Sequence, residues 1–271
     1  MKNWIGVSIG LTLAAVSAGG AWGVDHVEGY LPTAEIDVTR ILEPAPRPGD
    51  PRYETDREIF RATRALIGTS RWDMATNDAK LDPASLLRDY SCAVGISLTP
   101  QNAPRLTYVL RRAATDTARE TGEAKEIYQR HRPYTIDKGE ICQPESELYD
   151  TKAGRVSYDY PSGHTTRGWT YALVLASIAP DRAQQILERG RAYGDSRFVC
   201  GAHNESAVEA GMLSATATMT AIAGKPAYQA DLSAARAELA ALRRTGKPPQ
   251  DCAAEANLIG QRVMPRLAEE R

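Results

Sequence analysis

Apolar residues recur at helical spacing along most of the chain after residue 52. An amphipathic helix places such residues three and four positions apart, on one face. Segments with this pattern span residues 59–67, 106–128, 169–176, 181–193, 207–222, 232–242 and 258–267. Runs of alternating β-branched residues, which are typical of strands, are nearly absent. The pattern therefore predicts an all-α protein with a single helical-bundle domain over residues 53–271.

Residues 22–52, ahead of the first helical pattern, are rich in proline. Proline has no backbone N–H and blocks helix formation. The prolines of this segment are Pro32, Pro44, Pro46, Pro48 and Pro51. We expect the segment to form an extended, Pro-rich N-terminal strap that lies over the helical body.

The first residues have the pattern of a secretory signal peptide. Lys2 is followed by an apolar run at 4–16 and by small residues at 17–21. The apolar run is shorter than the roughly 20 residues of a membrane span, and an uncleaved anchor is the alternative. Residues 1–21 are therefore predicted to be removed, although the exact cleavage site stays open. This indicates a periplasmic or secreted protein with no stable membrane association after cleavage.

The cysteine count matters because export leads to an oxidising compartment. The four cysteines are Cys92, Cys142, Cys200 and Cys252. An even number in such a compartment favours at least one disulfide over four buried thiols, but the sequence does not choose among the three pairings. No two of them form a C-x-x-C pair, so a redox or metal role is not expected.

Charge and composition narrow the class of protein. Lys and Arg total 33 against 34 Asp and Glu, a net charge of −1. A nucleic-acid-binding protein normally has a basic excess, so no nucleic-acid partner is expected. Hydrophobic residues at 42% and charged residues at 25% are an ordinary globular mix. With four histidines and no Cys–His cluster, no metal site is predicted.

Three short segments collect the residues with the most distinctive chemistry, at 125–133, 161–164 and 196–203. Lys125, Arg132 and Arg197 supply cations, and a guanidinium fork fits phosphate oxygens well. The turn Pro161-Ser162-Gly163-His164 precedes an apolar helix. A helix N-terminus attracts anions, and Gly163 lets the backbone approach one closely.

Two imidazoles complete this set. His164 and His203 stand beside the predicted anion site, where one can attack phosphorus and the other can protonate the leaving oxygen. Each feature alone has an ordinary explanation, since a helical lysine is usually solvated and Pro-Ser-Gly is usually a turn. Their occurrence together in one order is what favours catalysis.

That order is Lys-x6-Arg-Pro, then Pro-Ser-Gly-His, then Ser-Arg-x5-His. It resembles the signature shared by bacterial class A non-specific acid phosphatases, type 2 phosphatidic acid phosphatases and vanadium-dependent haloperoxidases. The resemblance to the class A enzymes extends to the leader, the Pro-rich strap and Val199-Cys200-Gly201, and thus covers most of the mature chain. It implies an all-helical fold and metal-independent, cofactor-free hydrolysis of many small phosphate monoesters at acidic pH.

The resemblance also implies roles for individual residues. His203 is similar to the nucleophile that forms a phosphohistidine, and His164 to the general acid. The phosphate cradle is expected to consist of Lys125, Arg132, Ser162, the backbone of Gly163, and Arg197. His131 and His26 match no catalytic position; we expect His131 beside the cradle and His26 in solvent.

The chain departs from the family pattern after His203. The family continues His-x3-Asp, but position 207 here is alanine. An aspartate there would lie one turn from His203 and accept its ring N–H. Glu205 and Glu209 are close in sequence but belong to other helix faces, and a backbone carbonyl or a water is the remaining substitute. Ala207 therefore leaves two hypotheses, an active enzyme with another partner for His203 or a weakly active or inactive phosphate-binding homologue.

Two further functions share the signature. A lipid phosphatase of this type needs several membrane-spanning helices, and no uncharged run after residue 23 approaches that length. A vanadate-dependent haloperoxidase uses the same cradle, but this chain is short and matches the acid phosphatases in its leader and flanks. The physiological substrate and the oligomeric state stay open at this level.

Overall fold

The computed structural model describes residues 27–266, so the predicted signal peptide and His26 lie outside the described residues. The fold is all-α, as predicted, apart from one short hairpin. The α-helices of the described residues are α1 (Pro51–Thr63), α2 (Ser70–Asn77), α3 (Pro83–Val94), α4 (Pro104–Tyr128), α5 (Gly163–Ile178), α6 (Ala183–Val199), α7 (Glu205–Ala223), α8 (Pro226–Thr245) and α9 (Cys252–Ile259).

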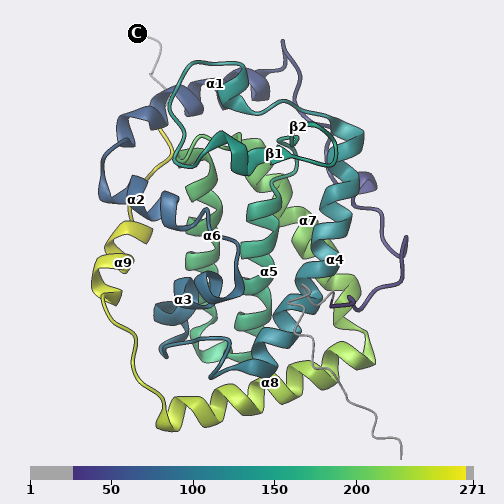
Figure 1. Ribbon diagram of the computed structural model, residues 1–271, viewed down its shortest axis with the longest axis vertical. Coiled ribbons are helices and arrows are strands. Elements are labelled where there is room, and N and C mark those ends of the chain that lie inside the picture. Colours follow the sequence, from purple (N-terminus) through teal and green to yellow (C-terminus); the bar gives the residue numbers. More distant parts are fainter. Residues whose placement is uncertain (1–26, 267–271) are drawn as a thin grey trace, which may run out of the picture.

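Helix α5 is the centre of the bundle and packs against α4, α6 and α7, while α8 crosses one end of it (Figure 1). The close approach of α5 to α6 depends on two glycines. A Cβ on Gly168 would lie 2.2 Å from Cδ1 of Tyr193, and one on Gly190 would lie 2.6 Å from Cβ of Ala172. Because real Cβ atoms do not come this close, any larger residue at either position would push the two helices apart.

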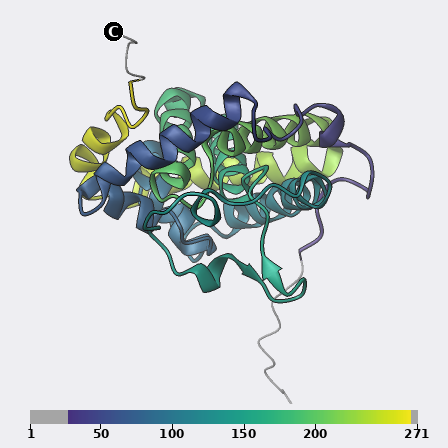
Figure 2. The same cartoon turned by 90° about the horizontal axis from the view of Figure 1, so that it is seen from above.

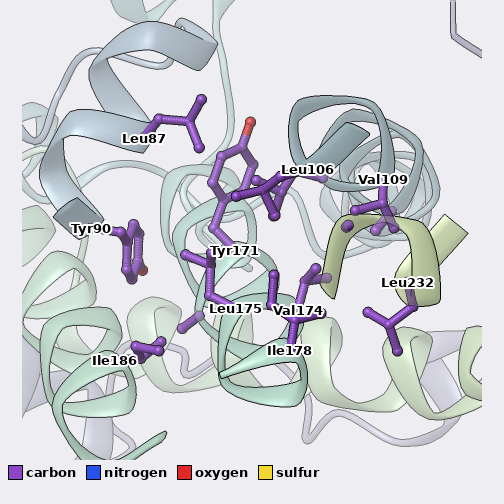
Figure 3. Packing of buried hydrophobic residues seen from close by; sticks show 14 of the residues in the cluster. Leu87, Tyr90, Leu106, Val109, Tyr171, Val174, Leu175, Ile178, Ile186 and Leu232 are labelled. Atoms are coloured by element: carbon purple, nitrogen blue, oxygen red, sulfur yellow. The ribbon is translucent and has the colours of Figure 1, made fainter. Parts of the chain in front are cut away.

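Figure 3 shows the main core, which forms where α5 meets its neighbours. Apolar side chains of α5 are surrounded by side chains from α3, α4, α6 and α8. The labelled members are Leu87, Tyr90, Leu106, Val109, Tyr171, Val174, Leu175, Ile178, Ile186 and Leu232. The Tyr90 hydroxyl donates a hydrogen bond of 2.7 Å to the carbonyl of Gly168, so this buried polar group is satisfied.

The chain between α4 and α5 forms the main non-helical part of the body. It contains an antiparallel hairpin of β1 (Tyr149–Asp150) and β2 (Arg155–Val156). Seen from above, this segment projects from the helical layers (Figure 2). It lies at the end of the bundle where α4 and α6 end and α5 and α7 begin (Figure 1).

The strap runs as irregular chain with one 3-10 turn at Val38–Arg40 and contacts the helices through hydrogen bonds. The backbone N–H groups of Tyr30 and Leu31 donate to the carboxylate of Asp116 on α4. The Tyr128 hydroxyl donates to the carbonyl of Leu42 at 3.3 Å. The strap thus lies on the body, as its proline content suggested.

Several helix predictions are confirmed and others need correction. The patterns at 106–128, 169–176, 207–222 and 232–242 fall within α4, α5, α7 and α8. The final helix, expected over 258–267, is instead α9, which ends before Gly260. The helix expected to begin near residue 181 starts with a 3-10 turn at Pro180–Arg182 and continues as α6 to Val199.

Two helices lie outside the predicted patterns, α2 with 8 residues and α3 with 12 residues. The start of α3 nevertheless carries a clear signal, because the Asp82 side chain accepts a hydrogen bond of 2.9 Å from the N–H of Ser85 and Pro83 occupies the first turn. Its end is equally clear, since Gly95 adopts a left-handed conformation with φ of 84°.

Two disulfides use all four cysteines, and the pairs are Cys92–Cys252 and Cys142–Cys200. The first attaches α9 to α3. The second joins the α4–α5 connection to the end of α6. Within residues 27–266, no helix is long and apolar enough to cross a membrane.

We predict that the Cys92–Cys252 disulfide contributes strongly to stability because it closes a loop of 160 residues. Replacing both cysteines by alanine should lower the free energy of unfolding by about 2–4 kcal/mol, measured by urea denaturation. The single variant Cys92→Ala should lose about as much, since it breaks the same bridge. A double variant as stable as the wild type would contradict this.

Candidate active site

The three sequence segments meet around one cavity of about 280 Å³ at the hairpin end of the bundle. Five of the seven predicted site residues line it: Lys125, Arg132, Gly163, His164 and His203. Ser162 and Arg197 are fully buried beside them and do not form part of its surface. The structure therefore brings the predicted residues together, with two of them behind the cavity wall.

The ring of His203 is buried, and its neighbours determine its tautomer. Nδ1 lies 2.8 Å from the carbonyl oxygen and 2.9 Å from Oδ1 of Asp159, both of which only accept hydrogen bonds. Nε2 lies 3.0 Å from Nη1 of Arg132, which only donates. Nδ1 therefore carries the proton, and Nε2 is the unprotonated nitrogen, whose lone pair accepts from Arg132 beside the cavity.

His164 is the second imidazole, with its ring centroid 6.3 Å from that of His203. Its Nε2 lies 3.2 Å from the carbonyl oxygen of Ala79, which only accepts. In the neutral ring Nε2 thus carries the proton and donates it to Ala79. Nδ1 is then the nitrogen that can take up or release a proton.

The segment 157–159 holds two of the cations that face the cavity. Arg132 donates from Nε to the Ser157 carbonyl and from Nη2 to the Ser157 hydroxyl, both at 2.7 Å. Lys125 donates from Nζ to the carbonyls of Tyr158 and Asp159. Because Asp159 also contacts His203, this one stretch of chain sets the relative position of Arg132, Lys125 and His203.

Arg197 is a buried cation with unused donors. Its Nη2 donates to the side-chain oxygen of Gln143. Among the described residues, its Nε and Nη1 have no hydrogen-bond partner. Gln143 is positioned in turn by a hydrogen bond of 3.3 Å to Glu147 and by its place beside the Cys142–Cys200 disulfide. A buried guanidinium with two free donors is suited to bind an oxyanion.

Ser162 and Gly163 form the start of α5. The Ser162 hydroxyl accepts hydrogen bonds from the N–H and the hydroxyl of Thr165, at 3.3 and 3.0 Å, and so caps the helix. A Cβ on Gly163 would lie 3.7 Å from Cε of Lys125, which places the helix N-terminus directly beside that cation. The first-turn N–H groups have no partner within the helix and add to the positive potential of the cavity.

Burial and mutual repulsion lower the proton affinity of the whole cluster. Burial, followed by the charge of Arg132, lowers the pKa of the Lys125 ammonium to about 7. Burial and the charge of Arg132 also hold the pKa of His203 well below its usual range. Burial and the charge of Arg197 do the same to the pKa of His164. An anion in the cavity would reverse these shifts because it stabilises each protonated form.

The principal residue that sequence reasoning missed is Asp159. It is separated from His203 by 44 positions, so the contact was invisible to motif spacing. Glu205 and Glu209, the two nearby carboxylates, both pair with Arg52 instead. His131 is exposed and lines a different hollow, beside the strap, so its expected place next to the cradle is wrong.

The potential metal ligands near the site can be assessed for the described residues. No group of three or more His, Cys, Asp and Glu side chains is placed to hold a metal ion within residues 27–266. The donors that face the cavity are mainly N–H groups and cations, which are partners for an anion.

Comparison with known proteins identifies the family. Residues 106–229 match the PAP2 superfamily model. The chain is 38% identical to the acid phosphatase of Zymomonas mobilis over 90% of this chain and 92% of that protein. It is 34% identical to the non-specific acid phosphatase of Salmonella typhimurium, over 78% of this chain and 83% of that protein. For the Providencia stuartii enzyme of the same name, the identity is 33%, over 79% and 86%. The chain belongs to the PAP2 superfamily, in the family of these acid phosphatases.

We predict that inorganic phosphate binds the cavity and raises the melting temperature. At a phosphate concentration of 100 times its Kd, the free energy of unfolding should rise by about 2.7 kcal/mol. In Arg197→Met, the loss of charged hydrogen bonds worth about 1.5–3 kcal/mol should weaken phosphate affinity about 10- to 100-fold. Differential scanning fluorimetry across phosphate concentrations measures both effects.

Arg191→Met is the matched control, because Arg191 is also on α6 but is exposed and pairs with Asp195. It should keep the wild-type response to phosphate. Equal responses from Arg197→Met and the wild type would show that Arg197 does not bind the anion.

Proposed function

We propose that the protein is an acid phosphatase that hydrolyses small phosphate monoesters through a phosphohistidine on His203. The observation that carries this proposal is the orientation of His203, which lines the cationic cavity with an unprotonated Nε2 beside Arg132 while Nδ1 is held by acceptors. A nucleophile needs an unprotonated nitrogen on a fixed ring, and the Nε2 lone pair becomes available for attack when Arg132 donates to a phosphoryl oxygen instead.

The reaction follows in two displacements. Nε2 of His203 attacks phosphorus, the ester P–O bond breaks, and His164 gives its proton to the leaving alcohol oxygen. Water then attacks the phosphohistidine, His164 takes a proton from that water, and the P–N bond breaks to release phosphate and restore His203. Lys125, Arg132 and Arg197 stabilise the charge on the phosphoryl oxygens in both steps.

His164 needs a proton for the first step, although burial and the charge of Arg197 hold its pKa low. The negative charge of the bound substrate removes this obstacle, because it raises the pKa of the nearby imidazole. Three cations supply the charge stabilisation that other phosphatases obtain from metal ions, so we propose a metal-independent, cofactor-free enzyme.

The size and lining of the cavity support broad specificity. Away from the cations, its wall is formed in part by Leu81, Ala118 and Leu148. Such side chains exclude water but form no directional hydrogen bonds, so they discriminate weakly between leaving groups. We therefore propose small phosphate monoesters as a class, with no single alcohol preferred.

The proposed location is the periplasm or the exterior of the cell. The signal-peptide pattern at 1–21 supports it, and so do the two disulfides, which persist in oxidising compartments. The hypothesis of an inactive homologue rested on Ala207 and the loss of a partner for His203. The contact with Asp159 favours an active enzyme instead.

We predict phosphatase activity on p-nitrophenyl phosphate that EDTA does not change and that His203→Ala reduces to the uncatalysed background. His131→Ala removes an exposed histidine and should behave as the wild type. Labelled phosphate should be trapped on the wild-type chain by an alkaline quench, but not on His203→Ala. Wild-type turnover no greater than that of His203→Ala would refute the proposal, and vanadate-dependent bromination without phosphatase turnover would favour a haloperoxidase.

We further predict that kcat/KM falls as the pH rises through about 7, beyond the fall at lower pH where His164 loses its proton, because kcat/KM reports the free enzyme and Lys125 loses its charge near 7. Lys125→Arg keeps the cation at higher pH, so its falling limb should move to higher pH. The substrate is identical in both profiles and its own ionisation cancels. Superimposable pH profiles would mean that Lys125 does not control this limb.

A further inference from the structure

We propose that Asp159 is the positioning residue of the His203 nucleophile. It takes the role of the family's aspartate, whose position in this chain is Ala207. This inference rests on the proposed function, because it assigns a role within the same reaction. Asp159 contacts His203 and does not line the cavity, so it acts through the imidazole.

The carboxylate of Asp159 is fully buried and fixed on every side. Oδ1 accepts from Nδ1 of His203 at 2.9 Å and from the backbone N–H of Asn204 at 3.1 Å. Oδ2 accepts from the Asn204 side chain at 2.7 Å and lies 3.8 Å from Nε of Arg130. With these partners it holds a single orientation toward His203.

The carbonyl oxygen of Asp159 also lies close to Nδ1, at 2.8 Å. A carbonyl is enough to orient the ring and to select the Nδ1–H tautomer. It carries no net charge, however, whereas attack by Nε2 places positive charge on the imidazole as the P–N bond forms. The carboxylate is the neighbour that stabilises this charge, so we expect its removal to affect kcat more than KM.

The surroundings of Asp159 allow its charge to be removed without unfolding the protein. Arg130 has other partners, since Nη2 donates to Asp56 and Nη1 donates to Ser206. The guanidinium therefore stays paired when Asp159 is neutral. In Asp159→Asn, the side chain keeps its volume but loses its charge.

Ala207 makes other contacts, through both its side chain and its backbone. Ala207 is fully buried beside Tyr160 and Ala210, and its carbonyl accepts a hydrogen bond of 2.9 Å from the N–H of Ser162. The backbone at 207 thus supports the start of α5, while its small side chain lets Tyr160 pack there. The carboxylate approaches His203 from the α4–α5 connection instead of from α7.

The decisive kinetic test compares Asp159→Asn with Glu205→Gln. We expect Asp159→Asn to lower kcat by between about 10²- and 10⁴-fold, to leave KM within about threefold, and to keep the phosphate-induced rise in melting temperature. Glu205 is close in sequence but pairs with Arg52, so Glu205→Gln should keep kcat within about threefold. Asp159→Asn with wild-type kcat, or an equal loss in Glu205→Gln, would overturn the proposal.

A second measurement does not depend on the stability of Asp159→Asn. Long-range ¹H–¹⁵N spectra of the histidines in the wild-type protein distinguish the two tautomers, and the chain has only four histidines. The resonance missing from His203→Ala identifies His203, and we expect it to be the Nδ1–H tautomer near neutral pH. An Nε2–H tautomer would overturn the proposal. This readout does not depend on turnover, so an inactive wild type with the Nδ1–H tautomer would refute the proposed function alone.

Discussion

The site depends on one short stretch of backbone, the residues Ser157 to Asp159. Ser157 holds Arg132, the carbonyl of Tyr158 holds Lys125, and Asp159 holds His203. Like charges in a small buried space repel, so they need fixed acceptors to keep them at the cavity wall. The same stretch leads directly into the start of α5. The relative positions of the cations, the proposed nucleophile and the helix N-terminus are therefore fixed together.

The residues around this stretch keep several cationic groups out of water. Their burial and mutual repulsion lower the pKa values of Lys125, His164 and His203. Among the described residues, Nε and Nη1 of the buried Arg197 also have no hydrogen-bond partner. An oxyanion in the cavity would reduce this repulsion, and we propose that it also accepts from the unused donors of Arg197. This repulsion is the physical basis of the affinity that we propose for a phosphoryl group, and the fixed geometry means that little reorganisation is needed when charge develops.

The sequence alone predicted the features that local physics determines. Long helices with a clear apolar face, such as α4, were recognised by their period. Lys125, Arg132, His164 and His203 were recognised because cations and imidazoles suited to phosphate chemistry occur together in one characteristic order. Short helices were missed because α2 offers too few turns to establish a period. The supports of the site were missed for another reason, since Gln143 and Asp159 reach their partners across 54 and 44 positions of chain. Only the folded backbone brings such pairs together.

The contact between Asp159 and His203 shows why a missing motif letter need not mean a missing function. The imidazole requires an acceptor within about 3 Å of Nδ1, and this requirement is one of space and not of position in the chain. The family pattern has its aspartate at position 207, on the first turn of α7, whereas this chain has its carboxylate at Asp159, on the connection before α5. In this chain the carboxylate and the backbone carbonyl of one residue both accept from Nδ1, and the same carbonyl accepts from Lys125. The proposed nucleophile and a proposed phosphate-binding cation are therefore both oriented by Asp159.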